Sequence, residues 1–252
     1  MNLGISGKRA LICGGSSGLG FAIGQALAAE GVDLVLFARK PDKLEQAKSR
    51  LAAQFEVKVD CVSGDMCSRA ELKKAAAWLR ASGGLDILIL NTARPPSPMR
   101  EMLEENDDER WREAYEQQLK AALNVLGEFT PLLVDKGWGR IIGITSATVK
   151  QPMPRHAIST IFRAGVQAAL KHLANETGRH GVTVNAVAPA TILTESLAKF
   201  HNLEERAAAI PLRRLGTTEE FAGTVAFIAS RQAGFITGQT IQVDGGMTQS
   251  LS

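Results

Sequence analysis

Short apolar runs alternate with longer helical segments along the whole chain, and this alternation constrains the fold more than any other feature. The runs are rich in aliphatic and β-branched residues and lie at 9–13, 32–38, 57–62, 85–90, 140–145, 182–188 and 239–243. Strands buried on both faces are typically continuous apolar runs, and a helix between successive strands makes a right-handed crossover that leaves them parallel. The sequence therefore predicts one doubly wound α/β domain over residues 1–252, with seven parallel strands and helices on both faces.

Composition and charge narrow the classes of function. Hydrophobic residues make up 45% of the 252 residues and charged residues 22%, a balance typical of a globular domain. The formal net charge is only +3 and no long basic run occurs, so we do not expect nucleic acid as a partner. No apolar stretch approaches the ~18 residues of a membrane span and no secretory signal is recognised, so we expect a cytoplasmic protein without a membrane partner. The cysteines Cys13, Cys61 and Cys67 lack the spacing of a zinc site, so we expect reduced thiols and no metal.

Glycines are concentrated in the turn after the first apolar run. Gly14, Gly18 and Gly20 follow that run and directly precede a helical pattern. Glycine lets the backbone turn tightly and approach a ligand, and the N-terminus of the following helix offers free N–H groups and a positive dipole to an anion. The turn is therefore predicted to bind the pyrophosphate of a dinucleotide.

A basic pair, Arg39 and Lys40, ends the second apolar run. An acidic residue at this point would bind a ribose 2′-hydroxyl and repel a 2′-phosphate, whereas arginine does the reverse. Arg39 therefore favours NADP(H) over NAD(H) as the cofactor. A solvated surface arginine is the alternative reading.

At these and further motifs the chain resembles the short-chain dehydrogenase/reductase family over essentially its whole length. Residues Cys13–Gly20 are similar to the family's TGxxxGIG turn, and Val184–Ala190 to its VNxVxPG motif. The segment Ile236–Gly246 resembles bacterial 3-oxoacyl-acyl-carrier-protein reductases. The resemblance implies a Rossmann-type fold and hydride transfer between a nicotinamide cofactor and a small-molecule substrate.

The same resemblance implies which residues hold the cofactor. Asp65 would contact the adenine, Asn91 matches the family's NNAG segment, and Thr194 would contact the cofactor phosphates. The full predicted set is Gly14, Ser16, Ser17, Gly18, Leu19, Gly20, Arg39, Lys40, Asp65, Met66, Asn91, Ala93, Arg163, Pro189, Ala190, Ile192 and Thr194.

Family members use an Asn–Ser–Tyr–Lys catalytic set, and the resemblance locates each position in this chain. The asparagine position falls on Gln118 and the serine position on Ser146. The tyrosine position falls on Ser159 and the lysine position on Arg163, so only the serine is retained. The family's tyrosine gives a proton to the substrate oxygen, and a serine hydroxyl is far less acidic than a phenol with a pKa of ~10. We therefore expect an atypical active site without the usual general acid, an effect typically contributing about 10²–10⁴-fold.

Two nearby side chains are candidates for the missing proton donor. Lys150, four residues after Ser146, is the first, because desolvation would lower the pKa of its ammonium group. His156, three residues before Ser159, titrates near neutrality and is the second. A solvated loop position or a contact to a substrate carboxylate is the alternative role of each. Arg163 is expected to donate to the nicotinamide ribose and to supply positive charge.

Three functions stay open on this reading. The first is NADP(H)-dependent oxidoreduction of a carbonyl or alcohol with a non-standard proton donor. The second is an NADP(H)-binding protein with little redox activity, and the third is another reaction class such as enoyl reduction, dehydration or isomerisation. The resemblance also implies a homotetramer, or a dimer, built on helices at about 106–135 and 156–179, and a lid at about 194–210.

Overall fold

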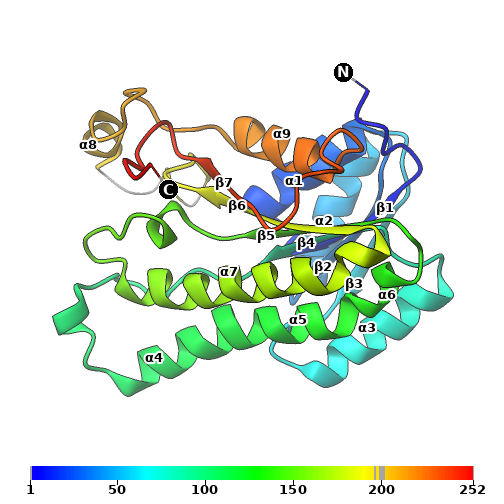
Figure 1. Ribbon diagram of the computed structural model, residues 1–252, viewed down its shortest axis with the longest axis horizontal. Coiled ribbons are helices and arrows are strands. Elements are labelled where there is room, and N and C mark those ends of the chain that lie inside the picture. Colours follow the sequence, from blue (N-terminus) through cyan, green and yellow to red (C-terminus); the bar gives the residue numbers. More distant parts are fainter. Residues whose placement is uncertain (1, 196, 199–201, 252) are drawn as a thin grey trace.

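The computed structural model describes residues 2–195, 197–198 and 202–251, and its centre is one seven-stranded sheet. All neighbouring strands pair in parallel, in the order β3-β2-β1-β4-β5-β6-β7 (Figure 1). The strands are β1 (Arg9–Cys13), β2 (Asp33–Ala38), β3 (Val59–Ser63), β4 (Ile87–Asn91), β5 (Gly139–Ile144), β6 (Val182–Pro189) and β7 (Thr240–Val243). The predicted doubly wound sheet is therefore confirmed, with its order reversing between β1 and β4.

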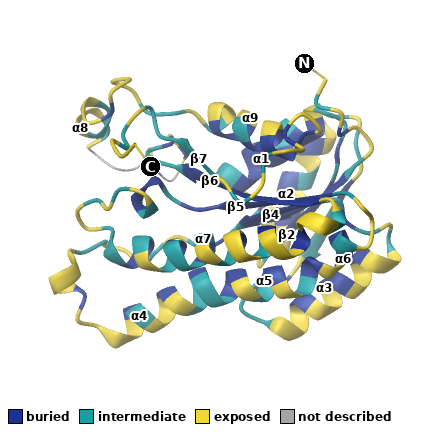
Figure 2. Ribbon diagram, viewed as in Figure 1, coloured by how far each residue is buried: buried dark blue, intermediate teal, exposed yellow. Residues whose placement is uncertain are grey.

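Helices cover both faces of this sheet. Successive strand residues point to opposite faces, so Ile12 packs in one core and Leu11 in the other. The first core is closed by α1 (Gly18–Ala29), α2 (Pro41–Ala52) and α9 (Thr218–Ala229). The second is closed by α3 (Arg69–Ala81), α5 (Ala121–Phe129), α6 (Pro131–Val134) and α7 (Ala157–Thr177). Figure 2 shows the sheet buried between these two layers and the outer helix faces exposed.

The predicted helix at about 106–135 is divided in the structure. It comprises α4 (Asp108–Ala114), a π-helical segment η2 (Tyr115–Lys120), then α5 and α6. Pro131 begins α6 because it has no N–H to continue the hydrogen-bond ladder of α5. The second long helix matches its prediction closely as α7, and the role of both as a subunit interface stays a prediction.

Two parts of the chain lie above the C-terminal edge of the sheet. The segment predicted as a lid contains α8 (Leu203–Ala208), and its residues 196 and 199–201 lie outside the described part of the chain. The short helix η3 (Ala147–Val149) follows β5 and leads to α7, and η1 (Met102–Glu104) and η4 (Gly178–His180) lie in other connections. Within the described ranges, no helix is both long enough and apolar enough to cross a membrane.

Candidate functional site

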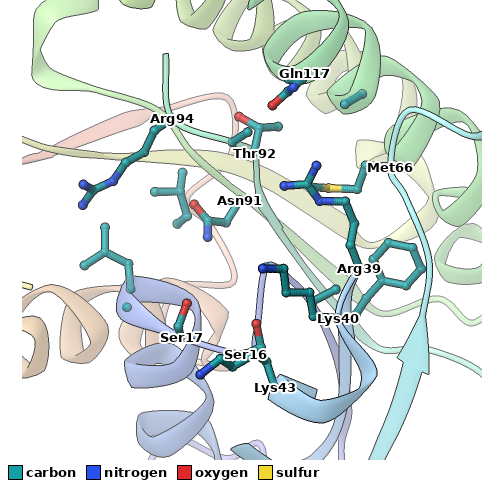
Figure 3. Close-up of a pocket in the computed structure, with 18 of the residues that line it drawn as sticks. Ser16, Ser17, Arg39, Lys40, Lys43, Met66, Asn91, Thr92, Arg94 and Gln117 are labelled. Atoms are coloured by element: carbon teal, nitrogen blue, oxygen red, sulfur yellow. The ribbon is translucent and has the colours of Figure 1, made fainter. Parts of the chain in front are cut away.

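A cavity of about 690 Å³ opens beyond the C-terminal ends of β1, β2 and β4, beside the reversal of strand order. Ligands of open α/β sheets bind at this kind of switch point. Figure 3 shows side chains from several loops converging on the cavity. The predicted cofactor residues that line it are Gly14, Ser16, Ser17, Gly18, Leu19, Arg39, Lys40, Asp65, Met66, Asn91, Ala93, Arg163, Pro189 and Thr194. The remaining three, Gly20, Ala190 and Ile192, are not part of the lining.

The glycine turn forms the floor beneath the N-terminus of α1. Gly14 and Gly18 have φ angles of +68° and +55°, which side-chain-bearing residues rarely adopt. A Cβ at Gly20 would lie 2.2 Å from the carbonyl oxygen of Gly14, so Gly20 serves the turn by packing and not by facing the cavity. Ser17 makes no side-chain cap to α1, and the first turn carries no acidic residue. The helix N–H groups and dipole are therefore available to an anion in the cavity.

Basic side chains gather at the end of β2. Arg39 and Lys40, which the sequence predicts to bind the cofactor, line the cavity, and Lys43 joins them (Figure 3). Pro41 begins α2, which places Lys43 one turn after Lys40 on the same side of the helix. Arg50, further along α2, also lines the cavity and stacks over the ring of Phe21 at 4.2 Å. This end of the cavity is suited to a phosphate group.

The loop after β3 supplies the opposite wall at this end. The Asp65 carboxylate accepts a hydrogen bond from the Cys67 amide at 2.9 Å, and the Asp65 amide donates to Glu71 at 2.8 Å. These contacts fix the loop that also carries Met66. Burial is the main cause that raises the pKa of the Cys67 thiol to about 11, with the Asp65 charge next, so Cys67 stays protonated at neutral pH.

Asn91 stands at the centre of the cavity, where β4 ends. A Cβ built on Gly14 would meet its Nδ2 at 2.9 Å, so the glycine turn and the end of β4 approach each other closely. The chain continues through Thr92 and Ala93 to Arg94, whose Nη2 donates to Thr194 Oγ1 at 3.2 Å. This contact links the loop after β4 to the loop after β6.

Arg163 forms the inner end of the cavity from α7. Its Nε lies 3.3 Å from Ser159 Oγ. Its terminal nitrogens donate to three backbone carbonyls, those of Ile144 at 3.4 Å, Thr145 at 3.3 Å and Ala93 at 3.4 Å. Burial, with a smaller contribution from the charge of Arg94, lowers the pKa of Arg163 to about 10. The guanidinium thus holds the ends of β4 and β5 against α7 while presenting a buried positive charge.

Three predicted catalytic residues, Ser146, Ser159 and Gln118, lie outside the cavity lining. Ser146 Oγ accepts hydrogen bonds from the Thr148 amide at 3.3 Å and the Thr148 hydroxyl at 2.9 Å, and it caps η3. Gln118 is fully buried within η2, and neither polar atom of its amide has a hydrogen-bond partner in the described structure. Its neighbour Gln117 is the residue of this segment that lines the cavity.

Comparison with known proteins places the chain in a family. The family profile described as "Enoyl-(Acyl carrier protein) reductase" matches residues 14–248. Nodulation protein G of Rhizobium sp. (strain N33) is 34% identical over 249 residues, which cover 96% of this chain and 98% of that protein. The chain belongs to the short-chain dehydrogenase/reductase family.

Further short-chain dehydrogenases/reductases agree with this assignment. The 3-oxoacyl-(acyl-carrier-protein) reductase of Staphylococcus epidermidis is 33% identical, over 95% of this chain and 98% of that protein. The crystal structure of L-sorbose reductase from Gluconobacter frateurii, complexed with NADPH and L-sorbose, superposes with a TM-score of 0.92 at 32% identity and covers 100% of both chains. Membership of this family makes the chain an oxidoreductase.

The two predicted proton donors, Lys150 and His156, do not line the cavity. Lys150 is exposed and lines a second hollow of about 640 Å³ between η3, α7 and β7, together with Lys171. His156 Nδ1 lies 2.7 Å from the carbonyl oxygen of Pro154, and His156 is not part of the cavity lining. The desolvation invoked for Lys150 is therefore absent here, and both assignments stay predictions.

Several lining residues were missed by the sequence argument. They are Lys43, Arg50, Cys67, Thr92, Arg94, Gln117, Thr145 and Glu195, with Phe37, Ala38, Gln46, Ala47, Gly64, Ala121 and Ile144. Helical spacing after Pro41 was the signal for Lys43, whereas Arg94 lies in an irregular loop with no periodic signal. Over the described ranges, no group of three or more His, Cys, Asp or Glu side chains is arranged to hold a metal ion.

Proposed function

We propose that this chain is an NADP(H)-dependent oxidoreductase that interconverts a small-molecule carbonyl and its alcohol by hydride transfer. One observation carries the proposal: Arg39, Lys40 and Lys43 line the same cavity as the anion-binding turn at Gly14 and Gly18. Two separate anionic groups, a pyrophosphate and a 2′-phosphate, match these two sites. The NADPH named in the complex of the related L-sorbose reductase supports the same cofactor.

The residues present fit such a cofactor along the length of the cavity. The turn and the α1 N-terminus would hold the pyrophosphate, Asp65 and Met66 the adenine, and Arg39 with Lys43 the 2′-phosphate. Asn91 and Arg163 would position the nicotinamide ribose at the inner end. When bound, the reduced cofactor supplies the hydride, and the protein has to orient the substrate and handle the proton.

Ser159 and Arg163 are the groups we propose for the substrate oxygen. Ser159 is buried behind Arg163, outside the cavity lining, and its Oγ accepts a hydrogen bond from Arg163 Nε. Its hydroxyl proton is therefore not used in that contact and would have to turn toward the substrate oxygen, while the cation stabilises developing negative charge. Burial brings the pKa of Arg163 to about 10, close to the ordinary value of a tyrosine phenol. We propose that the proton reaches the oxygen through Ser159, with Lys150 and His156 as the alternative donors predicted from the sequence.

The test is turnover and cofactor preference with the purified protein. NADPH and NADH are titrated separately, and a panel of ketones, enoyl thioesters and quinones is then followed at the nicotinamide absorbance band. We expect NADPH to bind at least about tenfold more tightly than NADH, and Arg39→Asp to reverse this preference. Lys48→Gln, on the following helix α2 but outside the cavity lining, is the control for a nearby charge change.

Three outcomes decide between the readings. Turnover of any ketone supports the proposal, and tighter binding of NADH contradicts the cofactor assignment. NADPH binding without turnover across the panel favours a binding protein. If Lys150→Ala and His156→Ala leave kcat/KM and its pH profile unchanged, these two residues are not the proton donors. If Ser159→Ala leaves them unchanged, the proposed proton route through Ser159 is wrong.

Enoyl reduction is the second candidate. The matching family profile carries the name of an enoyl reductase. Hydride addition to a conjugated double bond leaves negative charge on an enolate oxygen, which the buried charge of Arg163 would stabilise without an acidic phenol. Turnover of enoyl thioesters but not ketones would favour this reaction.

A further inference from the structure

Two guanidinium groups face the inner end of the cavity without an acidic partner. Arg94 and Arg163 both line it, and the charge of Arg94 acts on Arg163. None of the ion pairs between described residues involves either arginine. Of the two acidic side chains in the lining, Glu195 follows Thr194, the partner of Arg94, and Asp65 lies in the loop after β3. This end of the cavity therefore carries two guanidinium charges against one carboxylate.

The two arginines differ in what their donors do. Arg163 is buried, and its nitrogens are engaged by Ser159 and by three backbone carbonyls. Arg94 is exposed at the cavity wall, and its described hydrogen bond is the one to Thr194. A guanidinium carries five N–H donors in a planar fork. Four of those of Arg163 are engaged, which leaves one, whereas Arg94 has most of its donors to offer a ligand.

Arg94 is also separated from the positive charge at the end of β2. Figure 3 shows its guanidinium on the opposite side of Asn91 from Arg39 and Lys40. The proposed sites for the 2′-phosphate and the pyrophosphate are already built from the β2 end and the α1 turn. Neither phosphate group therefore needs the charge of Arg94. This charge can bind a ligand at the inner end of the cavity, where the nicotinamide would lie.

We propose that the substrate carries a carboxylate, and that Arg94 is the residue that binds it. This inference rests on the proposed function and names the class of its substrate: an oxo acid or the corresponding hydroxy acid. A planar guanidinium matches a carboxylate with two parallel hydrogen bonds, and such charge-assisted pairs are strong where water is partly excluded. The competing role for Arg94 is a contact to the cofactor phosphates through its neighbour Thr194.

The experiment compares acids with their uncharged esters on the full-length protein. The probes are pyruvate, acetoacetate and levulinate, each with its methyl ester, titrated onto the protein–NADPH complex and followed by nicotinamide fluorescence. The variants are Arg94→Gln and Arg94→Lys. Arg112→Gln is the matched control, because its side chain is 68% exposed on α4 and lies outside the cavity lining.

We expect at least one acid to bind about tenfold or more tightly than its ester in wild type and in Arg112→Gln. Arg94→Gln should abolish this difference with an NADPH affinity unchanged within about twofold, and Arg94→Lys should retain part of it. Acids and esters that bind equally, or a preference that survives Arg94→Gln, would overturn the proposal. An Arg94→Gln variant that loses NADPH affinity would also overturn it, by assigning Arg94 to the cofactor.

A failure of the proposed function can be told apart from a failure of the carboxylate proposal. The first titration, of wild type with NADPH alone, tests cofactor binding before any acid is added. If NADH binds and NADPH does not, the cofactor assignment fails, and the acid–ester comparison is carried out on the NADH complex.

Discussion

Arg163 Nε lies 3.3 Å from the Oγ of Ser159, one turn earlier on α7, and both side chains are buried. The other guanidinium contacts are backbone carbonyl oxygens, and no described carboxylate is paired with the charge. The charge is therefore stabilised only by neutral oxygen dipoles. Burying a charge in this way costs desolvation free energy. The free energy of unfolding should therefore depend on whether Arg163 is protonated.

The first prediction concerns the pH dependence of stability. Burial lowers the pKa of Arg163 from its ordinary value in the free side chain to about 10 in the folded protein. Between these values the unfolded chain binds more protons at this residue than the folded chain, so its contribution to the free energy of unfolding rises with pH. The cost of the buried charge is fully present below the folded pKa and is relieved as pH rises through it.

Arg163→Met isolates this contribution, because all other titrations are shared with wild type. We expect the free energy of unfolding of wild type, relative to the variant, to increase between about pH 9 and about pH 11 in urea titrations. Arg112→Met, at an exposed position, should show no such change. A difference between wild type and Arg163→Met that stays constant would mean that the folded protein keeps Arg163 charged throughout.

The second prediction concerns the amide of Gln118. Both of its polar atoms are buried without a partner among the described residues, so folding removes them from water with no compensating hydrogen bond there. Gln118→Leu should raise the free energy of unfolding by about 1 kcal/mol, measured by urea denaturation. Gln117→Leu is the control, because the Gln117 amide donates to Glu113 at 3.2 Å and gains nothing by removal.

Activity provides the second readout for the same variant. The sequence predicts a catalytic role for Gln118, so kcat/KM should fall in Gln118→Leu although stability rises. A loss of stability of similar size would show that the amide is satisfied by water inside η2.

The third prediction concerns Gly20. A Cβ there would stand 2.2 Å from the Gly14 carbonyl oxygen and 3.2 Å from the Gly15 Cα, and backbone cannot move aside as a flexible side chain does. Gly20→Ala should therefore lower the free energy of unfolding by about 2 kcal/mol and weaken cofactor binding. Gly223→Ala on α9, where a Cβ meets nothing within 4 Å, should stabilise the protein by about 0.5–1 kcal/mol. Equal effects at the two glycines would contradict the close approach in the turn.

The fold and the residues at the β1 and β2 end of the cavity follow from local patterns that the sequence carries directly. Apolar runs predict the strands, and a residue such as Arg39 is fixed in space because it ends a strand whose neighbours are known. The position of Gly14 is predicted in the same way. These residues sit at the boundary between a regular element and the edge of the sheet.

Irregular loops account for most of what could not be predicted. Lys150 comes six residues after the end of β5, and the short helix η3 directs it into the second hollow. The sequence has no periodic pattern in this connection from which that direction could be predicted. Arg94 enters the cavity because the loop after β4 meets Thr194, a residue 100 positions later. In the π-helical segment η2, Gln117 and not the predicted Gln118 lines the cavity, and the sequence carries no signal for this irregular turn.

The fourth prediction concerns the ion pair between Arg110 and Glu105, which braces the loop after β4. Arg110 donates to both carboxylate oxygens of Glu105, at 2.9 and 2.8 Å, and to the carbonyl oxygen of Pro98 at 2.7 Å. The Glu105 side chain is only 2% exposed. Arg110→Leu leaves that carboxylate buried and unpaired, and should cost about 3 kcal/mol in the free energy of unfolding.

The double variant Arg110→Leu, Glu105→Leu separates loss of the pair from burial of a lone charge. It should recover much of the stability lost in Arg110→Leu, because no unpaired charge remains. The hydrogen bond from Arg110 holds the pKa of Glu105 below its ordinary 4.5, so the pair's contribution is present above that value and is lost as pH falls through the folded pKa. Wild type should therefore lose stability relative to the double variant on acidification below about pH 4, and a double variant no more stable than Arg110→Leu would show that the arginine acts through Pro98 alone.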